Sequence, residues 1–517
     1  MCGWFAVLLS GILTGVSGQD FVPKREFRAA WVATMACIDW PSRKGLTPAE
    51  QQREFVRILD SLVACRMNAV IVQVRPKADA FYRSDTEPWS EYLTGRRDGD
   101  PGYDPLAFMV REAHRRGLEL HAWLNPFRIT SGEAVSALSP RSVARRHPDW
   151  TVRYGGRWYL DPGLPQVRDY LLSVVAEVVR RYPVDAIHMD DYFYPYPSGG
   201  QVFADEKTFR KYGAGRFDDV AQWRRDNVNR LIKGLADTIR ATREGVRFGV
   251  SPFGIYRNAS PDDSTGSRTK GLSNYDDLYA DVALWMRQGW VDYVLPQLYW
   301  ENGHPSADFG ELLRWWSRNG GRTQLYIGHG AFHIGEKQAS PCWNTAGEVC
   351  AQLRMQRENP VSCGSAFYSA RHLTGNAGGL ADSLRLRYYR YPALTPVGPC
   401  PAQGLPPKAR EVRSEQCEQG GVRVSWRGGR DRSEAYLSFD VPAAVRYYVV
   451  YRFRADQAVN INDASHIVGR VWADEGEQYS FFDKDASASH DWVYAVTSVG
   501  VTGVENEDFS LAVPFRG

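Results

Sequence analysis

The chain has 517 residues, 43% of them hydrophobic, which is enough for a large buried core and more than one domain. Its 63 basic and 60 acidic residues leave a formal net charge of +3, so charge gives no basis for nucleic acid or an anionic membrane as a partner. The 17 Trp and 27 Tyr residues serve either as core or as platforms on which the apolar faces of sugars stack.

The first twenty residues have the form of a secretory signal peptide. An apolar run from Trp4 to Val16 leads into small residues ending at Gly18, although the usual basic start is missing. The run is too short to span a bilayer, and no later stretch approaches about twenty apolar residues. We therefore expect residues 1–18 to be removed, no membrane span, and export to the periplasm, the outer membrane or the extracellular space.

Strand patterns alternate with helical patterns over residues 26–392. The strand candidates lie at 28–34, 68–76, 118–127, 185–194, 246–254, 291–300, 324–332 and 362–371, with helical patterns such as 48–66, 104–117 and 223–242 between them. Such alternation implies a parallel sheet. A doubly wound sheet also alternates, but eight units in about 360 residues fit a closed barrel better. We predict the α/β class, as a (β/α)8 TIM barrel.

The last part of the chain has a different character. Residues 393–407 are rich in Pro and lack helical periodicity, which indicates a linker. Within 408–517, short strand patterns lie at 421–428, 446–453, 478–483 and 492–503. They are typical of a small all-β sandwich similar to a fibronectin type III module. We expect a spacer rather than a second sugar-binding module, because no exposed aromatic trio is evident.

Polar side chains gather at the carboxyl ends of the predicted strands, the face where barrel enzymes hold their active sites. They are Gln73, Arg75, Asn125, Arg128, Asp190, Asp191, Ser251, Gln297, Glu301, His329, His333, Tyr368 and Arg371. We therefore expect the active site at this end of the barrel.

The segment 185–194 carries the strongest signal. Alternate residues of a strand share a face, and the apolar Ile187 and Met189 belong against the outer helices. We therefore expect His188 and Asp190 to point into the barrel mouth. Adjacent carboxylates such as Asp190 and Asp191 also occur as loop caps or metal ligands. The inward His and the Tyr-rich continuation favour catalysis.

Glycoside hydrolysis normally needs two carboxyl groups, one as proton donor and one as nucleophile or base. We predict Asp190 as nucleophile, base or stabiliser of the charged intermediate. Glu301 is the candidate general acid, because it shares a strand face with Gln297 and Tyr299. Asp191 is the rival for this role, and an ordinary loop acid is the alternative for Glu301.

Further side chains are candidates for holding the sugar. They are Arg75, Asn125, Arg128, Asp161, His188, Tyr192, Gln297, Tyr299 and Trp300. Arg75 could instead keep Asp190 ionised, and Asp161 could cap the following helix. The histidines come from different strands without an H-x-x-x-H pair, so no metal or other cofactor is indicated.

Residues 26–33, 68–76, 121–126, 188–195 and 296–300 resemble the glycosyl-hydrolase-like 10 family of bacterial barrel proteins. The resemblance covers most of residues 26–390, and its most specific string is His-Met-Asp-Asp-Tyr-Phe-Tyr-Pro at 188–195. It implies a (β/α)8 barrel and glycosidase activity, which in some members is directed at peptidoglycan glycan strands stripped of their stem peptides. It also places the family's acidic pair at Asp190 and Asp191.

The fourth strand is weakly similar to that of chitinase-type barrels, whose spaced acids end in a catalytic Glu. Aligning on Asp185 and Asp190 puts His188 at an Asp position and Tyr192 at the Glu position. The chain thus departs from that pattern at the proton donor. Substrate-assisted hydrolysis, in which an N-acetyl group supplies the nucleophile, stays open.

These observations predict an exported glycoside hydrolase whose partner is a bacterial polysaccharide or oligosaccharide, with the N-acetylated peptidoglycan backbone as the expected substrate. Two other classes stay open. A non-catalytic glycan-binding barrel would bind sugar without turnover, and a metal-dependent hydrolase or deacetylase would lose activity with a chelator. Nothing in the sequence sets the oligomeric state.

Overall fold

The computed structural model describes residues 22–337, 339–398, 404–418, 420–428, 444–473, 476–486 and 491–512. The predicted signal peptide, 1–18, and the middle of the predicted linker lie outside these residues. In the part of the chain that is described, every helix is too short or too polar to cross a membrane.

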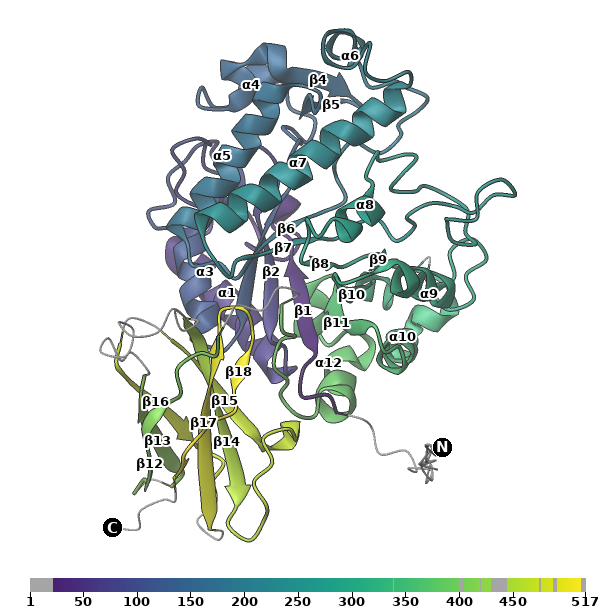
Figure 1. The fold of residues 1–517 in the computed structure, drawn as a ribbon. Helices are drawn as coiled ribbons and strands as arrows, with labels where there is room; N and C mark the ends of the chain where they lie inside the picture. Colours follow the sequence, from purple (N-terminus) through teal and green to yellow (C-terminus); the bar gives the residue numbers. More distant parts are fainter. Residues whose placement is uncertain are drawn as a thin grey trace, which may run out of the picture.

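A closed parallel barrel forms the larger part of the molecule (Figure 1). Its strands are β1 (Phe27–Val32), β2 (Ala69–Arg75), β3 (Glu119–Leu124), β6 (Ala186–Met189), β7 (Arg247–Val250), β8 (Tyr293–Val294) with β9 (Gln297–Leu298), β10 (Gln324–His329) and β11 (Ser362–Phe367). Both β8 and β9 pair with β10, so they form one interrupted strand. The pairing of β11 with β1 closes the ring and confirms the predicted (β/α)8 fold.

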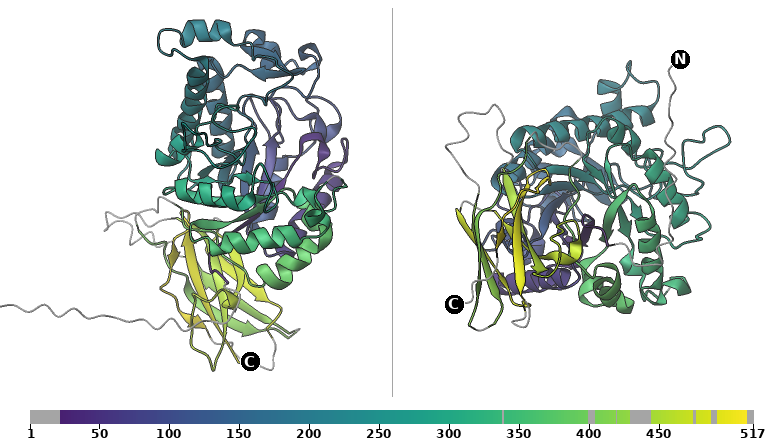
Figure 2. Two further views of the ribbon diagram at one scale, coloured as in Figure 1. Left: turned by 90° about the vertical axis from the view of Figure 1, so that its right-hand side faces the viewer. Right: turned by 60° about the horizontal axis from the view of Figure 1, so that its bottom comes forward.

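Helices surround the barrel (Figure 2). The longer ones are α1 (Pro48–Ala64), α3 (Pro105–His114), α5 (Pro165–Arg181), α7 (Val220–Thr242), α9 (Phe309–Asn319) and α10 (Gly347–Glu358). The shorter ones are α2 (Glu91–Thr94), α4 (Val143–Arg146), α6 (Glu206–Tyr212), α8 (Val282–Arg287), α11 (Ala370–Thr374) and α12 (Leu380–Ser383). Local sequence sets their ends. In α1, Thr47 and Glu50 form a capping box around Pro48, which suits the first helical position.

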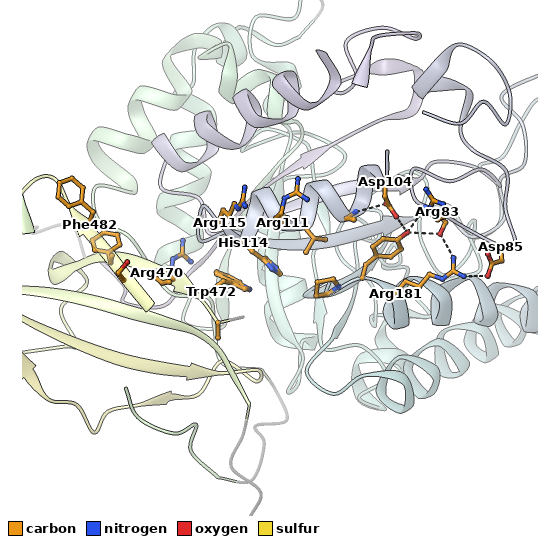
Figure 3. A pocket seen from close by; sticks show the side chains of 18 residues that line it. Arg83, Asp85, Asp104, Arg111, His114, Arg115, Arg181, Arg470, Trp472 and Phe482 are labelled. Atoms are coloured by element: carbon orange, nitrogen blue, oxygen red, sulfur yellow. Dashed lines mark hydrogen bonds and ion pairs between the residues drawn. The ribbon is translucent and has the colours of Figure 1, made fainter. Parts of the chain in front are cut away.

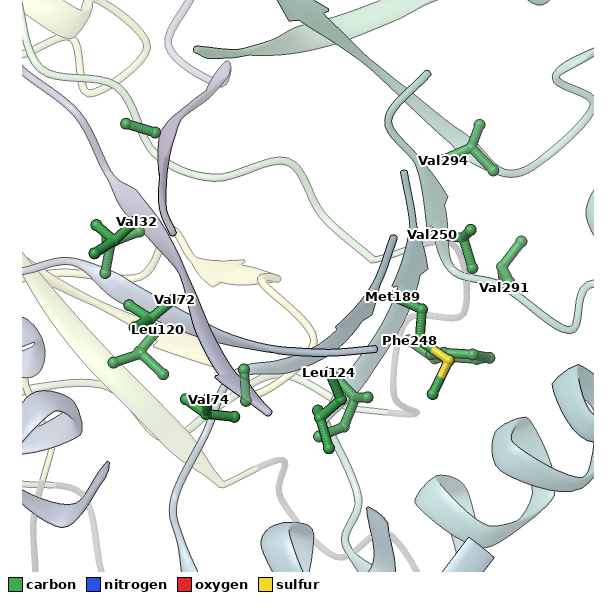
Figure 4. Packing of buried hydrophobic residues seen from close by; sticks show 14 of the residues in the cluster. Val32, Val72, Val74, Leu120, Leu124, Met189, Phe248, Val250, Val291 and Val294 are labelled. Carbon is green, nitrogen blue, oxygen red and sulfur yellow. The ribbon is translucent and has the colours of Figure 1, made fainter. Parts of the chain in front are cut away.

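The barrel strands separate two hydrophobic cores. Residues such as Val72, Leu124 and Val250 point outward and pack against the helices (Figure 4). The alternate residues form a smaller, more aromatic core inside the barrel, which includes Trp31 and Tyr293. Because each strand is buried on both faces, it appears in the sequence as an almost continuous apolar run, and this explains why the strands are visible there.

Two antiparallel sheets form the C-terminal domain. One contains β12 (Arg410–Gln416), β13 (Val422–Arg427) and β16 (Gln478–Asp483). The other contains β14 (Val445–Arg454), β15 (Ile467–Trp472), β17 (Trp492–Gly500), β18 (Glu505–Asn506) and β19 (Leu511–Ala512). Val424 and Trp426 of the first sheet share a core with Val450 and Val496 of the second. The assignment to the fibronectin type III class stays a prediction.

The C-terminal domain packs against the base of the barrel, where the strands begin. Arg446 of β14 donates to Glu119, the first residue of β3, at 3.2 Å and to the carbonyl oxygen of Gly245 just before β7 at 2.7 Å. At the start of the predicted linker, Leu394 is buried in the core of the C-terminal domain, and Thr395 also donates to Glu119. The domain therefore does more than space the barrel, because it supplies contacts to the barrel interior.

Candidate active site

A cavity of about 220 Å³ opens at the carboxyl ends of the barrel strands. Its lining comprises Trp31, Ala33, Met35, Ile38, Gln73, Trp123, Asn125, Arg128, Asp190, Tyr192, Ser251, Gln297, Tyr299, Phe332 and Tyr368. Seven of the polar residues expected at the strand ends are among them, namely Gln73, Asn125, Arg128, Asp190, Ser251, Gln297 and Tyr368. The cavity therefore lies on the predicted face.

Asp190 and Asp191 follow directly after β6, as the strand ends. Ala186 lies in the core inside the barrel, whereas Ile187 and Met189 lie in the outer core, so the predicted alternation holds up to this point. Asp190 Oδ1 accepts hydrogen bonds from Gln297 Nε2 at 3.1 Å and from the backbone N–H of Asp191 at 2.7 Å. Both carboxyl groups are buried, but only that of Asp190 faces the cavity.

The two carboxyl groups shift each other's pKa in opposite directions. Burial and the neighbouring Asp191 carboxylate raise the pKa of Asp190 well above its usual value. Burial also raises the pKa of Asp191, but the Asp190 side chain and the hydroxyl of Tyr196, which donates to Asp191 Oδ2, favour its charged form. Two carboxyl groups this close do not both ionise readily. The pair therefore retains one proton, held on Asp190.

Aromatic rings form the walls of the cavity around Asp190. Trp31, Trp123, Tyr299 and Tyr368 contribute faces or edges of the kind that pack against pyranose rings. The guanidinium carbon of Arg128 lies 4.6 Å from the ring centre of Tyr192. Its buried Nε has no hydrogen-bond partner among the described residues, so this donor is available to a ligand.

A chain of hydrogen bonds runs from beneath the cavity to the base of the barrel. Trp31 Nε1 donates to His188 Nε2 at 3.3 Å, so the proton of neutral His188 is on Nδ1, which contacts the Tyr293 hydroxyl at 3.0 Å. That hydroxyl also contacts His121 Nδ1 at 2.8 Å, and His121 Nε2 lies 3.2 Å from Glu119. Burial lowers the pKa of His188 well below its usual value, which keeps the ring neutral.

The structure gives these histidines partners within the barrel core. His188 does not line the cavity as a sugar ligand but supports Trp31, which does. Among the residues that the structure describes, no three His, Cys, Asp or Glu side chains are grouped as metal ligands would be.

Two predicted sugar-binding residues lie away from the cavity. Arg75 is buried beside Glu87, to which Nε donates at 2.7 Å, and it also contacts the carbonyl oxygen of Pro126. It therefore fixes the loop after β3 rather than holding Asp190 ionised. Asp161 accepts from the backbone N–H of Gly163 at 2.9 Å and from the hydroxyl of Thr208, and burial raises its pKa to about 6. These contacts describe a turn before α5.

Glu301 and Trp300 also lie outside the cavity lining. Glu301 Oε2 accepts from Trp343 Nε1 at 3.2 Å, and Trp300 packs edge-on against Phe253 with ring centres 5.5 Å apart. Of the residues predicted to act in catalysis, the structure thus brings Asp190 and Asp191 together and leaves Glu301 apart. Tyr192, Gln297, Tyr299, Asn125 and Arg128 lie where they were expected.

Several residues that line the cavity are apolar or aromatic, so a search for polar side chains at the strand ends does not select them. Trp31 and Trp123 point inward from β1 and β3, and strand alternation could have placed them there. Met35, Ile38 and Phe332 come from loops beyond the strand ends, where no periodicity applies. The most useful missed signal is therefore the inward-pointing Trp on β1 and on β3, the two strands that flank β2.

A closed (β/α)8 barrel with an acidic pair at the carboxyl ends of its strands is an architecture common among enzymes that hydrolyse glycosides. The model of the Glycosyl hydrolase-like 10 family matches residues 26–345, and the chain belongs to this family.

Two relatives agree with this assignment. The chain is 41% identical over 478 residues to Glycosyl hydrolase YngK of Bacillus subtilis (strain 168), a match that covers 92% of this chain and 90% of that protein. It is 40% identical over 368 residues to Glycosyl hydrolase DigH of Escherichia coli (strain K12), covering 67% and 83%. Family membership and these relatives place the chain among the glycoside hydrolases.

A solved structure, the PgaB (BpsB) glycoside hydrolase domain from Bordetella bronchiseptica, is also similar. It has 13% sequence identity and a TM-score of 0.46, and the match covers 70% of this chain and 98% of that one.

Proposed function

We propose that the chain is an exported enzyme that cleaves glycosidic bonds in peptidoglycan glycan strands lacking stem peptides, with Asp190 as the proton donor. The observation that carries this assignment is the arrangement of the acidic pair. Asp190 faces the cavity, and Asp191 lies behind it as the charged partner. The export part of the proposal rests on the N-terminal sequence.

Asp190 has the properties of a general acid. A group that protonates the leaving oxygen must hold its proton near neutral pH, and burial together with Asp191 keeps the pKa of Asp190 raised. Its Oδ1 already accepts two hydrogen bonds, from Gln297 and from the backbone of Asp191. The proton therefore belongs on Oδ2, where the neighbouring Asp191 carboxylate favours it until the leaving oxygen of a substrate takes it.

The substrate supplies the second group in this proposal. As the Asp190 proton passes to the leaving oxygen, the carbonyl oxygen of the sugar's own N-acetyl group bonds to the anomeric carbon. Water then opens the cyclic intermediate and returns a proton to Asp190. This route accounts for a cavity in which, among the described lining residues, Asp190 is the single carboxylic acid. It requires an N-acetylated sugar, as the peptidoglycan backbone provides.

Digestion of purified glycan strands, with and without stem peptides, tests the proposal when products are read by mass spectrometry. We expect the wild-type protein to release defined oligosaccharides and Asp190→Asn to be slower by about 10²–10⁴-fold, the usual contribution of a general acid. Glu301→Gln is the matched control, because it removes a carboxylate at the same end of the barrel but outside the cavity. It should keep most of the activity.

Chemical removal of the N-acetyl groups tests the nucleophile separately. Strands so treated should bind but remain uncut. If they are cut as fast as untreated strands, the substrate-assisted route is wrong. If wild-type protein binds both kinds of strand and cleaves neither, the enzyme proposal for this substrate fails and the glycan-binding alternative takes its place.

A further inference from the structure

A second, larger hollow lies at the junction of the barrel and the C-terminal domain (Figure 3). Its volume is about 1110 Å³, and it is an open groove rather than an enclosed cavity. One wall comes from α3 and the end of α5, and the other from β15 and β16 of the C-terminal domain. It shares no lining residue with the cavity that holds Asp190.

The groove is positively charged in a protein whose overall charge is nearly balanced. Five arginines line it, namely Arg83, Arg111, Arg115, Arg181 and Arg470, against two carboxylates, Asp85 and Asp104. Both carboxylates already have partners, because Asp85 pairs with Arg181 and Asp104 accepts from the Tyr182 hydroxyl at 2.8 Å. Arg111 and Arg115 share one partner next to the groove, Glu112, at 3.3 and 3.2 Å, and Arg181 also pairs with Glu177 at 2.9 Å. The five arginines therefore exceed the four acids around them by one, which favours an anionic ligand.

Arg470 strengthens this conclusion. It extends from β15 into the groove, and its buried Nη1 has no hydrogen-bond partner among the described residues. A guanidinium has five N–H donors, and leaving one of them buried without a partner is costly unless a ligand satisfies it. Burial lowers the pKa of Arg470, the opposite of the rise that a carboxylate partner causes in Arg247.

Apolar side chains form the floor between the arginines. Val110 of α3, Pro183 and Val471 line the groove, and Phe482 at one end is 48% exposed. Trp472 is unsuited to stacking on a ligand, because His114 and Tyr447 both stack on it, with ring centres 4.8 and 4.9 Å away. An apolar floor with a cationic rim suits a sugar ring, which has an apolar C–H face, when that sugar also carries a carboxylate.

We propose that this groove is a second glycan-binding site, which recognises the carboxylate groups of an acidic glycan strand. The choice of a glycan over other anions rests on the proposed function. In peptidoglycan, removal of a stem peptide leaves a free lactyl carboxylate on the muramic acid residues. The groove would therefore hold stripped strands in preference to strands whose carboxylates are joined to peptide.

Binding measured in full-length Asp190→Asn protein tests the site without turnover. The probes are glycan strands with free lactyl carboxylates and the same strands after methyl esterification, which removes the charge. We expect esterification to weaken binding at least tenfold, and rising salt to weaken binding of the free-acid strands more than that of the ester. Equal affinity for the two probes would overturn the proposal.

A matched pair of double variants locates the binding. Arg111→Gln with Arg115→Gln removes two exposed charges from the groove wall, and Arg314→Gln with Arg318→Gln removes two exposed charges at the same spacing from α9. We expect the first pair to lose at least tenfold in affinity for free-acid strands and the second to lose little. Equal losses would show general charge attraction and overturn the site.

The groove and the catalytic proposal can fail separately. Cleavage of short neutral oligosaccharides should be unchanged in the Arg111→Gln, Arg115→Gln protein with an intact Asp190, because neither arginine lines the catalytic cavity. If wild type cleaves nothing but the two double variants still differ in binding, the groove stands and the catalytic proposal falls. Tighter binding of a single-stranded oligodeoxynucleotide than of the free-acid strand would overturn the choice of a glycan.

Discussion

The two ends of the barrel hold buried carboxyl groups in opposite electrostatic states. At the mouth, Asp190 faces another carboxyl group, and burial together with Asp191 raises its pKa. At the base, burial alone would also raise the pKa of Glu119, but Arg247, His121 and Arg446 outweigh it and hold the pKa well below its usual value. Similar burial thus gives a retained proton at one end and a fixed negative charge at the other.

The difference separates function from structure. An acid that keeps its proton is useful to a reaction but costs stability when it ionises, so it belongs at a catalytic mouth. A carboxylate held by two cations contributes to the fold and has no proton to give. Glu119 receives Arg247 from a barrel strand and Arg446 from the C-terminal domain, so it joins the two domains.

Removing the charge at the base should have the largest effect on stability. Glu119→Gln leaves Arg247 and Arg446 without their buried counter-charge, and breaking such a pair costs about 3–5 kcal/mol. Asp190→Asn, the matched change at the mouth, removes a carboxyl group for which burial and Asp191 outweigh the charge of Arg128. It should leave the free energy of unfolding unchanged or higher. Denaturant unfolding at pH 7 measures both. Equal losses in the two variants would contradict the comparison.

Removing one cation at the base should cost less. Arg446→Met keeps the aliphatic packing but removes the contacts with Glu119 and the Gly245 carbonyl, and we expect a loss of about 1.5–3 kcal/mol in unfolding measurements. Arg454→Met is the control on the same strand, where an exposed pair with Asp456 contributes less than about 1 kcal/mol. A smaller loss for Arg446→Met than for Arg454→Met would show that the base contact contributes nothing.

The pH dependence of stability should have opposite signs at the two ends. Because the pKa of Asp190 is raised in the folded protein, its contribution to the free energy of unfolding is fully present below about pH 4 and is lost as the pH rises toward that raised pKa. Over this range, wild type should therefore lose stability relative to Asp190→Asn. The lowered pKa of Glu119 makes its contribution present above about pH 4 and lost as pH falls through the folded value. Slopes should reach at most about 1.4 kcal/mol per pH unit. If the contributions of Asp190 and Glu119 to stability changed in the same direction with pH, the assignment of opposite electrostatic states to the two ends would be wrong.

The smallest effect concerns the pair at the mouth. In wild type, the Tyr196 hydroxyl donates to Asp191 and lowers the pKa of that carboxyl group. Tyr196→Phe removes this hydroxyl, so the pKa of Asp191 should rise. One hydrogen bond to a charged group contributes about 1.5 kcal/mol, equivalent to about one pKa unit. The acid limb of the rate–pH profile should therefore move up by about one unit. An unchanged limb would mean that Asp191 does not need to be ionised.

The barrel and part of its site could be predicted because they follow strand periodicity. Asp190 and Gln297 lie where alternation places them, directly at or next to the strands. Arg75 departs from expectation because the register of β2 against β3 shifts between Gln73 and Arg75, which re-aims the side chain toward Glu87. Glu301 departs because β9 ends at Leu298, so alternation no longer governs a residue three positions later.

The groove and the contacts at the base lay beyond sequence reasoning for another reason. Each brings together residues from distant parts of the chain, such as Arg115 with Arg470 and Glu119 with Arg446. No local period relates such residues, since their meeting depends on how the two domains pack. The sequence of β15 gave no hint that Trp472 would be enclosed by His114 and Tyr447.

The closure of the barrel also determines when each strand can pair while the chain is being synthesised. β1 needs β11, which ends at Phe367, and Lys24 just before β1 pairs with Glu505 at 2.7 Å. A chain still leaving the ribosome therefore carries an unpaired β1 edge through most of its translation, and such edges invite pairing with other chains. β1 can pair with β2 early, but it is among the last strands to find its second partner. A growing chain therefore needs shielding of the open edge of β1 more than of any strand in the middle of the barrel.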